Sequence, residues 1–337
     1  MGKILLSTIR LREEASYLEA HGLRILNPPE AIASKEWIEE NIKEADIMLL
    51  SNHDLERSTM EKATKLKLVV TTTSGYDHID VEYAEERGIC IANQPEAIAF
   101  SVAEHAIGMT IALTKNIVTG YNYVWNGLWD RYPRFLLGNL IRGKCASIVG
   151  MGRIGALISK YLRELGVGKI LYYSRRRKPE LEVLFMAEPS SLERIFTSCD
   201  IIYITLPLTK ETENLITYDL LRKAKKGSII VNLGRGKVLK LSNIIKLLEE
   251  RSDVRLALDV MENEPFSDIG VLKGYKGRVL INPHIAGDSY ESWNATLKMA
   301  LRQIVDYVEK GMVWNPVTNA CRGSHDIKDY WESFALA

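Results

Sequence analysis

The sequence predicts an α/β fold built from parallel β-sheets, and three observations lead to this class. Short apolar runs alternate with amphipathic helical stretches along most of the chain, which is the order of repeated βαβ units. A glycine motif with Gly150, Gly152 and Gly155 lies between an apolar run and a helical pattern. The chain has 337 residues, which is enough for two domains of ordinary size.

The first hundred residues predict one parallel sheet and its helices. Strands are expected at 4–7, 23–26, 47–51, 68–72 and 89–92, and helices at 12–21, 34–43, 60–64 and 81–87. Polar loops at 51–54 and 73–77 follow the third and fourth strands. Because ligands of open parallel sheets bind beyond the carboxyl ends of strands, both loops are candidates for a binding site.

Two segments lie between the halves of the chain. Residues 101–114 predict an apolar helix, which Ser101 and Glu104 would open as a capping box and which should be buried because it is apolar nearly all round. Residues 119–143 are aromatic and irregular, with Trp129 and Tyr132 among them. This segment indicates either a subunit interface or loop cover for the neighbouring helix.

The second half repeats the alternation of strands and helices. Strands are expected at 146–149, 169–173, 201–205, 228–232, 254–260 and 279–282, and helices at 156–165, 191–196, 219–225, 242–250 and 290–309. The last helix would return the chain to its first domain. The tail, 315–337, has no clear period and receives no assignment.

The glycine motif indicates a dinucleotide site. Gly150 allows a tight turn, Gly152 lets the backbone approach a pyrophosphate, and Gly155 lets the helix pack on the strand. The helix N-terminus would then face the anion. The alternative is a glycine-rich turn without a ligand.

The residues after the second strand of this half indicate the cofactor. About 20 residues past Gly155, where an NAD site places Asp or Glu, the chain has Ser174, Arg175, Arg176 and Arg177, with no nearby carboxylate. A guanidinium fork matches a phosphate, so we expect NADP(H) to be preferred and NAD(H) to be used weakly. The alternative is a solvated basic loop.

Composition and charge exclude several classes of partner. The net charge is +1, so no global field favours nucleic acid or an anionic membrane. We expect no apolar run of membrane-spanning length and no signal peptide. Four cysteines are scattered without metal spacing or a disulfide framework, which predicts a reducing, cytoplasmic setting. They are Cys90, Cys145, Cys199 and Cys321.

Three polar groups end the last strands, and together they suit hydride-transfer chemistry. Reduction of a ketone leaves an alkoxide that needs a proton, and His284 is the side chain tuned to supply one. Glu264 can fix its tautomer and raise its pKa, and Arg235 can hold a 2-oxo acid through its carboxylate. Taken one at a time, the three are better explained by a salt-bridged turn, a helix start and a core histidine. Their joint occurrence at successive strand ends, beside the glycine motif, favours a catalytic site.

These residues resemble those of the D-isomer-specific 2-hydroxyacid dehydrogenases. The resemblance covers about residues 45–318 and rests on the segments 74–80, 102–104, 150–155 and 206–209 with Thr212, and on the three strand ends. It implies a central dinucleotide-binding domain at 101–287 and a substrate-binding domain split between 1–100 and 288–337, both Rossmann-like. Members are usually dimers joined through the dinucleotide domain.

The resemblance also implies roles for single residues. Arg235 would bind substrate, Glu264 would assist, and His284 would be the catalytic acid and base. Ser74 and Gly75 would supply backbone donors for the substrate carboxylate. Cofactor contacts would come from Val102, Gly150, Gly152, Arg153, Ile154, Gly155, Ser174, Arg175, Arg176, Leu206, Pro207, Thr212, Leu233, Gly234, Ala286 and Asp259, the last through the nicotinamide carboxamide.

Within the family the chain is most similar to glyoxylate/hydroxypyruvate reductases. The run 172–175 resembles NADPH-preferring members, and Tyr132 lies near where some reductases send an aromatic side chain into the partner's site. Ser51 and Ser174 stand where phosphoglycerate dehydrogenases typically have basic and acidic residues. Two departures are Ser147, where glycine is usual, and Lys240-Leu241, which replace an acidic pair and could alter the cap of the following helix.

The sequence therefore predicts an NADPH-dependent reductase of small 2-oxo acids, most simply glyoxylate or hydroxypyruvate. A 3-phosphoglycerate dehydrogenase is the alternative enzyme, and a dinucleotide-sensing binding protein of the same fold is the alternative from another class. The expected partners are the 2-oxo acid and a second copy of the chain. No metal, nucleic acid or membrane is expected.

Overall fold

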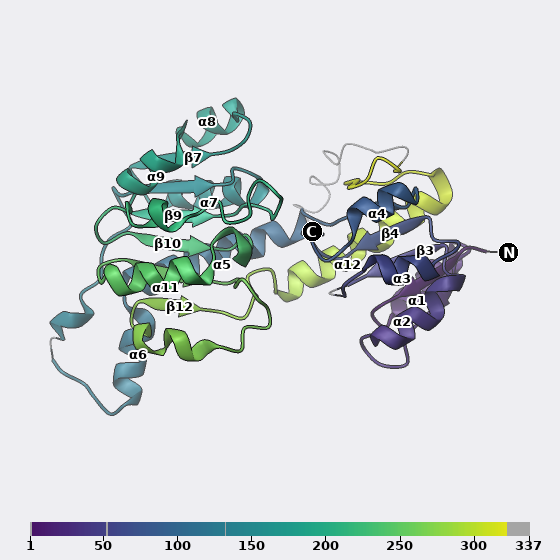
Figure 1. Cartoon of the computed structure of the whole chain (residues 1–337), viewed down its shortest axis with the longest axis horizontal. Helices are drawn as coiled ribbons and strands as arrows, with labels where there is room; N and C mark the ends of the chain where they lie inside the picture. The colour runs from purple at the N-terminus through teal and green to yellow at the C-terminus, as the bar shows by residue number, and fades with distance from the viewer. Residues whose placement is uncertain (1, 52, 132, 322–337) are drawn as a thin grey trace. The chain divides into compact units, whose positions relative to one another are not determined.

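A computed structural model describes residues 2–51, 53–131 and 133–321 and divides the chain into two compact units. Unit 1 comprises Met1–Ile98 and Ser289–Ala337, and unit 2 comprises Ala99–Asp288 (Figure 1). Each unit contains one sheet whose strand pairs are all parallel. The predicted fold class is confirmed.

Unit 1 has a five-stranded sheet in the order β2-β1-β3-β4-β5. All four residues of β3 and of β4 are buried, as expected for parallel strands covered on both faces. The strands are β1 Ile4–Ser7, β2 Arg24–Leu26, β3 Ile47–Leu50, β4 Leu68–Thr71 and β5 Cys90–Ala92. The helices are α1 Glu13–Ala20, α2 Lys35–Asn41, α3 Arg57–Lys62, α4 Val81–Glu86 and α12 Tyr290–Lys310.

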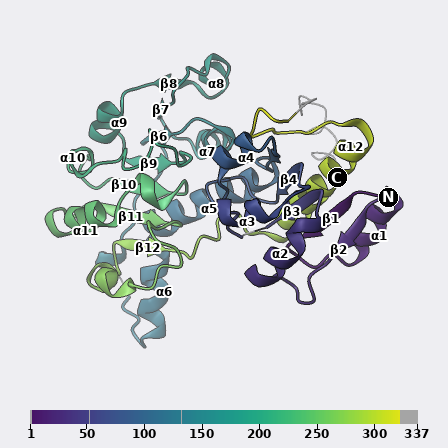
Figure 2. The same ribbon diagram turned by 45° about the vertical axis from the view of Figure 1, so that its right-hand side comes forward.

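Unit 2 has a seven-stranded sheet in the order β12-β11-β10-β9-β6-β7-β8, which Figure 2 lets the reader follow. The strands are β6 Cys145–Val149, β7 Lys169–Tyr173, β8 Ala187–Pro189, β9 Ile201–Ile204, β10 Ile229–Asn232, β11 Arg255–Leu258 and β12 Val279–Ile281. Because β6 pairs with β7 on one side and β9 on the other, chain order reverses there. Such a reversal is where doubly wound sheets bind ligands.

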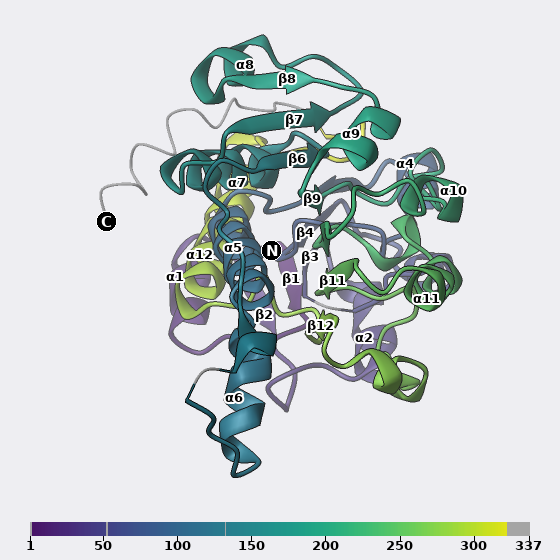
Figure 3. The same cartoon turned by 90° about the vertical axis from the view of Figure 1, so that its left-hand side faces the viewer.

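Helices cover both faces of the unit 2 sheet. Figure 3 shows α5 and α7 on one face and α9, α10 and α11 on the other. The helices are α5 Ala97–Thr114, α6 Ile117–Trp125, α7 Arg153–Glu164, α8 Pro179–Phe185, α9 Leu192–Ser198, α10 Tyr218–Leu221 and α11 Leu241–Glu250. Every predicted strand is present with ends within two residues, whereas α8 and the edge strand β8 were not predicted.

Helix α5 corrects two expectations. It begins at Ala97, so Ser101 lies inside the helix instead of capping it, and its hydroxyl donates to the Ala286 carbonyl at 2.8 Å. By length and composition α5 could also cross a membrane, contrary to the expectation that no run would. Eight of its residues are buried, and Thr110 hydrogen-bonds the Tyr203 hydroxyl from inside unit 2. Packing therefore accounts for its apolar composition.

The segment expected to be irregular at 119–143 contains helix α6. The prediction of an irregular segment was wrong there. Helix α6 has no buried residue, so its sequence lacks the alternation of apolar and polar residues by which a surface helix is recognised. Figure 3 shows α6 standing away from the sheet of unit 2. Tyr132 lies outside the described residues.

The cysteines form two disulfides, so the expectation of no disulfide framework was wrong. Cys90 pairs with Cys321 and Cys145 with Cys199, each with a Cα–Cα distance of 4.6 Å. The partners are 231 and 54 residues apart in sequence, and spacing of that kind carries no pairing signal.

Candidate active site

The three polar groups after the last strands lie at one edge of the unit 2 sheet. Arg235 follows β10, Glu264 follows β11 and His284 follows β12, and these strands are neighbours in a parallel sheet. The Nδ1 atom of His284 lies 2.5 Å from Glu264 Oε2. The structure therefore brings together a histidine and a carboxylate from separate loops.

Asp259 holds the backbone around His284. The N–H of His284 donates to the Asp259 carbonyl at 2.8 Å, and the carboxylate accepts from Ile285 N at 3.0 Å and Ala286 N at 2.9 Å. His284 has a φ of 55°, a left-handed conformation that is uncommon outside glycine. The three hydrogen bonds hold this turn and aim the imidazole.

The charges at this edge shift the pKa values of His284 and Glu264 in opposite directions. The hydrogen bond to Glu264 raises the pKa of His284, and burial and the charge of Arg235 only partly oppose it. For Glu264, burial favours the neutral form, but hydrogen bonds from His284 and Met261 N, with the charges of His284 and Arg235, leave its pKa below the usual value. Each shift therefore favours the charged form of its group.

Arg235 extends from a turn that requires close backbone contact. Its Nη1 donates to the Gly234 carbonyl at 2.9 Å, and Asn232 bonds both the Gly234 N–H and the Arg235 carbonyl. A Cβ on Gly234 would lie 2.5 Å from the Leu206 carbonyl oxygen, so a larger residue would collide with the backbone. Leu233 beside it is buried.

The glycine turn between β6 and α7 fits a dinucleotide. Gly150 has a φ of 112°, and a Cβ there would lie 2.9 Å from the Thr205 backbone. A Cβ on Gly152 would meet nothing within 4 Å, which leaves space for a ligand. The first turn of α7, with Arg153 and Ile154, presents N–H groups that the helix itself cannot satisfy.

The three arginines after β7 differ in their partners. Arg177 pairs with Glu182 at 2.5 Å, whereas Arg175 and Arg176 are exposed and have no ion pair within the described residues. A Thr209 hydroxyl bond and, among weaker causes, the charge of Arg175 lower the pKa of Glu211. The expectation of no nearby carboxylate was therefore wrong, because Glu211 arrives from another loop.

The remaining predicted cofactor residues of unit 2 are placed as follows. Thr212 organises its own loop, accepting from Thr209 N at 2.8 Å and donating to the Pro207 carbonyl at 2.6 Å. Its hydroxyl is thus committed within the protein. Leu206 and Val102 are buried, as is Ala286.

Both departures from the family pattern are accommodated. The buried Ser147 hydroxyl donates to the Ile201 carbonyl at 3.3 Å, which ties β6 to β9. The N-terminus of α11, where Lys240 provides no side-chain cap, is completed by Glu262, which accepts from Leu241 N at 3.0 Å. A carboxylate from the next loop replaces the missing acidic pair.

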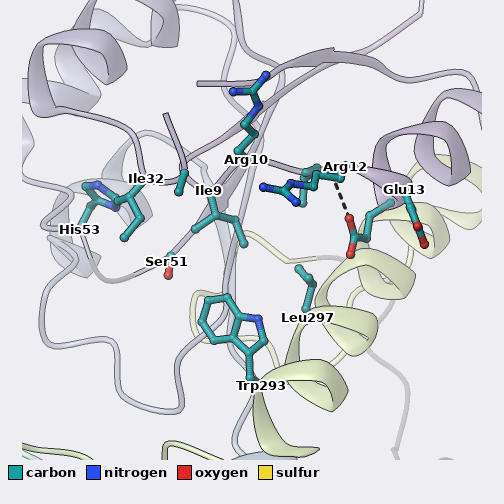
Figure 4. A pocket seen from close by; sticks show the side chains of 12 residues that line it. Ile9, Arg10, Arg12, Glu13, Ile32, Ser51, His53, Trp293 and Leu297 are labelled. Carbon is teal, nitrogen blue, oxygen red and sulfur yellow. Dashed lines mark hydrogen bonds between the residues drawn. The ribbon is translucent and has the colours of Figure 1, made fainter. Parts of the chain in front are cut away.

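Unit 1 holds Ser74 and Gly75 in the loop after β4. A pocket of about 590 Å³ lies at the carboxyl ends of β1 and β3 in the same unit. Figure 4 shows Arg12, Ile9, Trp293 and Leu297 grouped around it. The sequence had drawn attention to the 51–54 loop, and Ser51 and His53 line the pocket too, but nothing had indicated Arg12 or Trp293.

The sequence analysis did not identify two polar side chains that lie near these sites. His105 of α5 places Nε2 at 3.7 Å from Asp259 Oδ1, and Asn93 donates to the Ser74 carbonyl at 2.6 Å. His105 follows the 102–104 motif directly, which was a signal for it. Asn93 comes directly after a predicted strand of the same sheet, which was the corresponding signal.

Comparison with known proteins identifies the family. Residues 107–286 match the family described as D-isomer specific 2-hydroxyacid dehydrogenase, NAD binding domain. A glyoxylate reductase of Pyrococcus furiosus is 33% identical over 279 residues, covering 81% of this chain and 82% of that protein. The chain belongs to the D-isomer-specific 2-hydroxyacid dehydrogenases. Members of this family are NAD(P)-dependent oxidoreductases that transfer hydride to or from 2-hydroxyacids, and this protein is one of them.

Solved structures of this dehydrogenase family show the same fold. A glyoxylate reductase from Paecilomyes thermophila has a TM-score of 0.82 and 27% identity, with 94% of this chain and 98% of that chain covered. An NAD⁺-bound 3-phosphoglycerate dehydrogenase from Entamoeba histolytica has a TM-score of 0.79 and 26% identity, covering 95% and 99%. The chain is therefore about equally similar to a structure of each activity.

Proposed function

We propose that this 2-hydroxyacid dehydrogenase is an NADPH-dependent reductase of small 2-oxo acids, with glyoxylate or hydroxypyruvate as substrate. The observation that carries the proposal is the hydrogen bond between Glu264 and His284, which raises the pKa of an imidazole that also senses the charge of Arg235. The relatives named glyoxylate reductase support the choice of substrate. We further infer a homodimer.

Each member of the triad has one task in this proposal. Bound nicotinamide supplies the hydride. Nδ1 of His284 is committed to Glu264, so Nε2 is the ring nitrogen that gives its proton to the oxygen that becomes the hydroxyl. Glu264 stabilises the imidazolium before transfer and holds the same ring orientation after it. Arg235 binds the carboxylate and polarises the ketone.

The cofactor would be held along the carboxyl edge of the unit 2 sheet. Gly150, Gly152 and Gly155, with Arg153 and Ile154 at the start of α7, would receive the pyrophosphate. Around the rest of the dinucleotide we place Val102, Leu206, Pro207, Thr212, Leu233, Gly234, Asp259 and Ala286.

The preference for NADP(H) follows from the loop after β7. Arg175 and Arg176 have no ion-pair partner within the described residues, so their guanidiniums are free for a 2′-phosphate, with the Ser174 hydroxyl beside them. Glu211 senses the charge of Arg175 and so reduces this attraction, whereas Arg176 adds a second cation to the loop. NAD(H) remains a weak cofactor, since the loop offers its 2′-hydroxyl no Asp or Glu carboxylate as acceptor.

A dimer would cover the apolar surface around α6. Trp125 is 74% exposed and Trp129 81%, and Leu137 is 75% exposed. Several exposed apolar side chains on one segment are typical of an interface between protein subunits.

The deciding experiment is oxidation of NADPH followed at 340 nm with glyoxylate, hydroxypyruvate, pyruvate and 3-phosphohydroxypyruvate. The proposal expects the first two to be reduced most efficiently. A clear preference for the phosphorylated substrate would make the protein a 3-phosphoglycerate dehydrogenase. Binding of NADPH without turnover of any of the four would indicate a dinucleotide-sensing binding protein.

A further inference from the structure

The pocket of unit 1 carries charged side chains of both signs. It has a volume of about 590 Å³ and lies at the carboxyl ends of β1 and β3. The charged groups that line it are two guanidiniums and two carboxylates, from Arg10, Arg12, Glu13 and Glu14. The proposed function gives none of these residues a role. A cavity of this size with a few convergent polar groups is typical of a small-molecule site.

Arg12 presents a guanidinium that is not engaged by the protein. Its backbone N–H is bonded, but its side chain makes no hydrogen bond or ion pair within 2–51, 53–131 and 133–321. Figure 4 shows this side chain extending toward Ile9 in the pocket. Arg10, by contrast, donates from Nη1 to the Pro29 carbonyl at 2.7 Å. Arg12 is therefore the cation that an anionic group of a ligand would meet.

Glu14 places a carboxylate next to this cation. Its Oε2 accepts from the Arg12 N–H at 3.0 Å, so the acidic group lies against the backbone of the residue that carries the positive charge (Figure 4). Glu14 is half-buried and has no ion-pair partner in the part of the chain that the structure describes. A partly buried charge without a partner is unfavourable, and a bound ammonium would compensate it.

Another part of the wall is apolar and incompletely covered. Ile9 and Leu11 are buried just after β1, while Trp293 of α12 is 49% exposed and Ile32 is 61% exposed. Figure 4 shows Trp293 and Leu297 together on the α12 side of the pocket. Exposed apolar side chains that face a cavity favour a ligand with an apolar part, because contact with it removes their surface from water.

We propose that this pocket is a binding site for a free α-amino acid with an apolar side chain. Arg12 binds its carboxylate, Glu14 binds its ammonium, and Trp293 with Leu297 contacts its side chain. A zwitterion is the complementary ligand because a plain anion would lie beside the uncompensated Glu14, and a plain cation beside the uncompensated Arg12. The site does not depend on which 2-oxo acid the enzyme reduces.

A series of ligands tests the three contacts without any substitution. Calorimetric titration of the full chain compares L-leucine with 4-methylpentanoate, which lacks the ammonium, with 3-methylbutylamine, which lacks the carboxylate, and with glycine, which lacks the side chain. We expect each of the three to bind roughly 10- to 100-fold more weakly than L-leucine, the weight of one charged contact or one buried aliphatic side chain. Equal affinity for L-leucine and 4-methylpentanoate, or no binding of L-leucine, overturns the proposal.

Two variants test the charged contacts one at a time. Arg12→Gln removes the cation, and Glu14→Gln removes the anion while its amide oxygen can still accept from the Arg12 N–H. Both should weaken L-leucine binding roughly 10- to 100-fold, but Glu14→Gln should not weaken binding of 4-methylpentanoate. Arg24→Gln is the matched control, because Arg24 is an exposed arginine of β2 outside the pocket. Thermal unfolding shows that each variant is folded, and unchanged L-leucine affinity in folded Arg12→Gln refutes the site.

A further variant separates this pocket from the active site. L-leucine carries a carboxylate, the group that Arg235 binds in the proposed function. Arg235→Gln should leave the Kd for L-leucine within twofold, since Arg235 is not among the residues that line the pocket. Loss of binding in Arg235→Gln would place the amino acid at the active site and overturn the proposal. The titrations contain no NADPH, so their outcome is independent of whether any 2-oxo acid is reduced.

Discussion

His284 Nδ1 and Glu264 Oε2 lie 2.5 Å apart, and the other ring nitrogen, Nε2, has no hydrogen-bond partner among the residues that the structure describes. The two side chains come from the loops after β11 and β12, neighbouring strands of one parallel sheet. Their pKa values move apart, up for His284 and down for Glu264, which keeps both charged over a wider range of pH. The pair therefore favours the protonated imidazole that can donate a proton.

Removing the imidazole should abolish most of the turnover. We expect His284→Ala to lower kcat for 2-oxo acid reduction by roughly 10²- to 10⁴-fold, the usual weight of a general acid. The Kd for NADPH should change little, because the glycine turn and the loop after β7 are intact. Steady-state kinetics and a fluorescence titration of NADPH check both halves, and near-normal turnover would remove His284 from the mechanism.

The pH dependence of reduction should follow His284. Reduction needs the protonated imidazole, so kcat should fall as pH rises through its raised pKa. In Glu264→Gln the hydrogen bond to a carboxylate and its charge are lost, while burial and Arg235 still lower the pKa. The basic limb of the kcat profile should therefore move to lower pH. An unshifted limb would show that another group titrates.

Cofactor preference should respond to Arg175 and not to Arg177. One charge-assisted contact to a 2′-phosphate supports roughly 10- to 150-fold preference for NADPH over NADH in kcat/KM. Ser174→Asp combined with Arg175→Ala should reverse it, because the new carboxylate accepts from a 2′-hydroxyl and repels phosphate. Arg177→Ala is the control, since Arg177 is paired with Glu182. Preference for NADH in the unsubstituted enzyme would refute the assignment.

The exposed tryptophans around α6 should hold a dimer together. We expect a dimer by sedimentation velocity at micromolar concentration, and a shift to monomer in Trp125→Glu with Trp129→Glu, because charge is costly in an apolar interface. Val183 is 83% exposed on α8, and Val183→Glu should leave the dimer intact. A monomeric unsubstituted protein contradicts this prediction.

The disulfide between Cys90 and Cys321 should stabilise unit 1. It closes a loop across 231 positions, and cross-links of this kind contribute about 2–5 kcal/mol by restricting the unfolded chain. Under oxidising conditions, the double variant Cys90→Ser with Cys321→Ser should therefore have a lower Tm than the unsubstituted protein. Under reducing conditions, where neither protein has the cross-link, the two Tm values should be equal. Peptide mapping of the unreduced protein identifies the linkage directly, and free thiols at both positions would exclude it.

Much of the site could be predicted because parallel strands align their carboxyl ends. Arg235, Glu264 and His284 each follow an apolar run, so pattern alone places them at one edge of a sheet. The pairing of His284 with Glu264 and the three hydrogen bonds that Asp259 accepts could not be predicted. They depend on side-chain directions and on a left-handed turn that no spacing encodes.

The sequence by itself determined the order of strands and helices, the glycine turn, the family and the set of candidate catalytic residues. These follow from local periodicity and from residue types at strand ends. Only the tertiary structure decided which arginine after β7 is already paired, that Glu211 lies near Arg175, that Cys90 meets Cys321, and that Asn93 holds the Ser74 carbonyl. Each of these joins residues distant in sequence or chooses between equivalent neighbours, and such choices are made by packing of the folded chain.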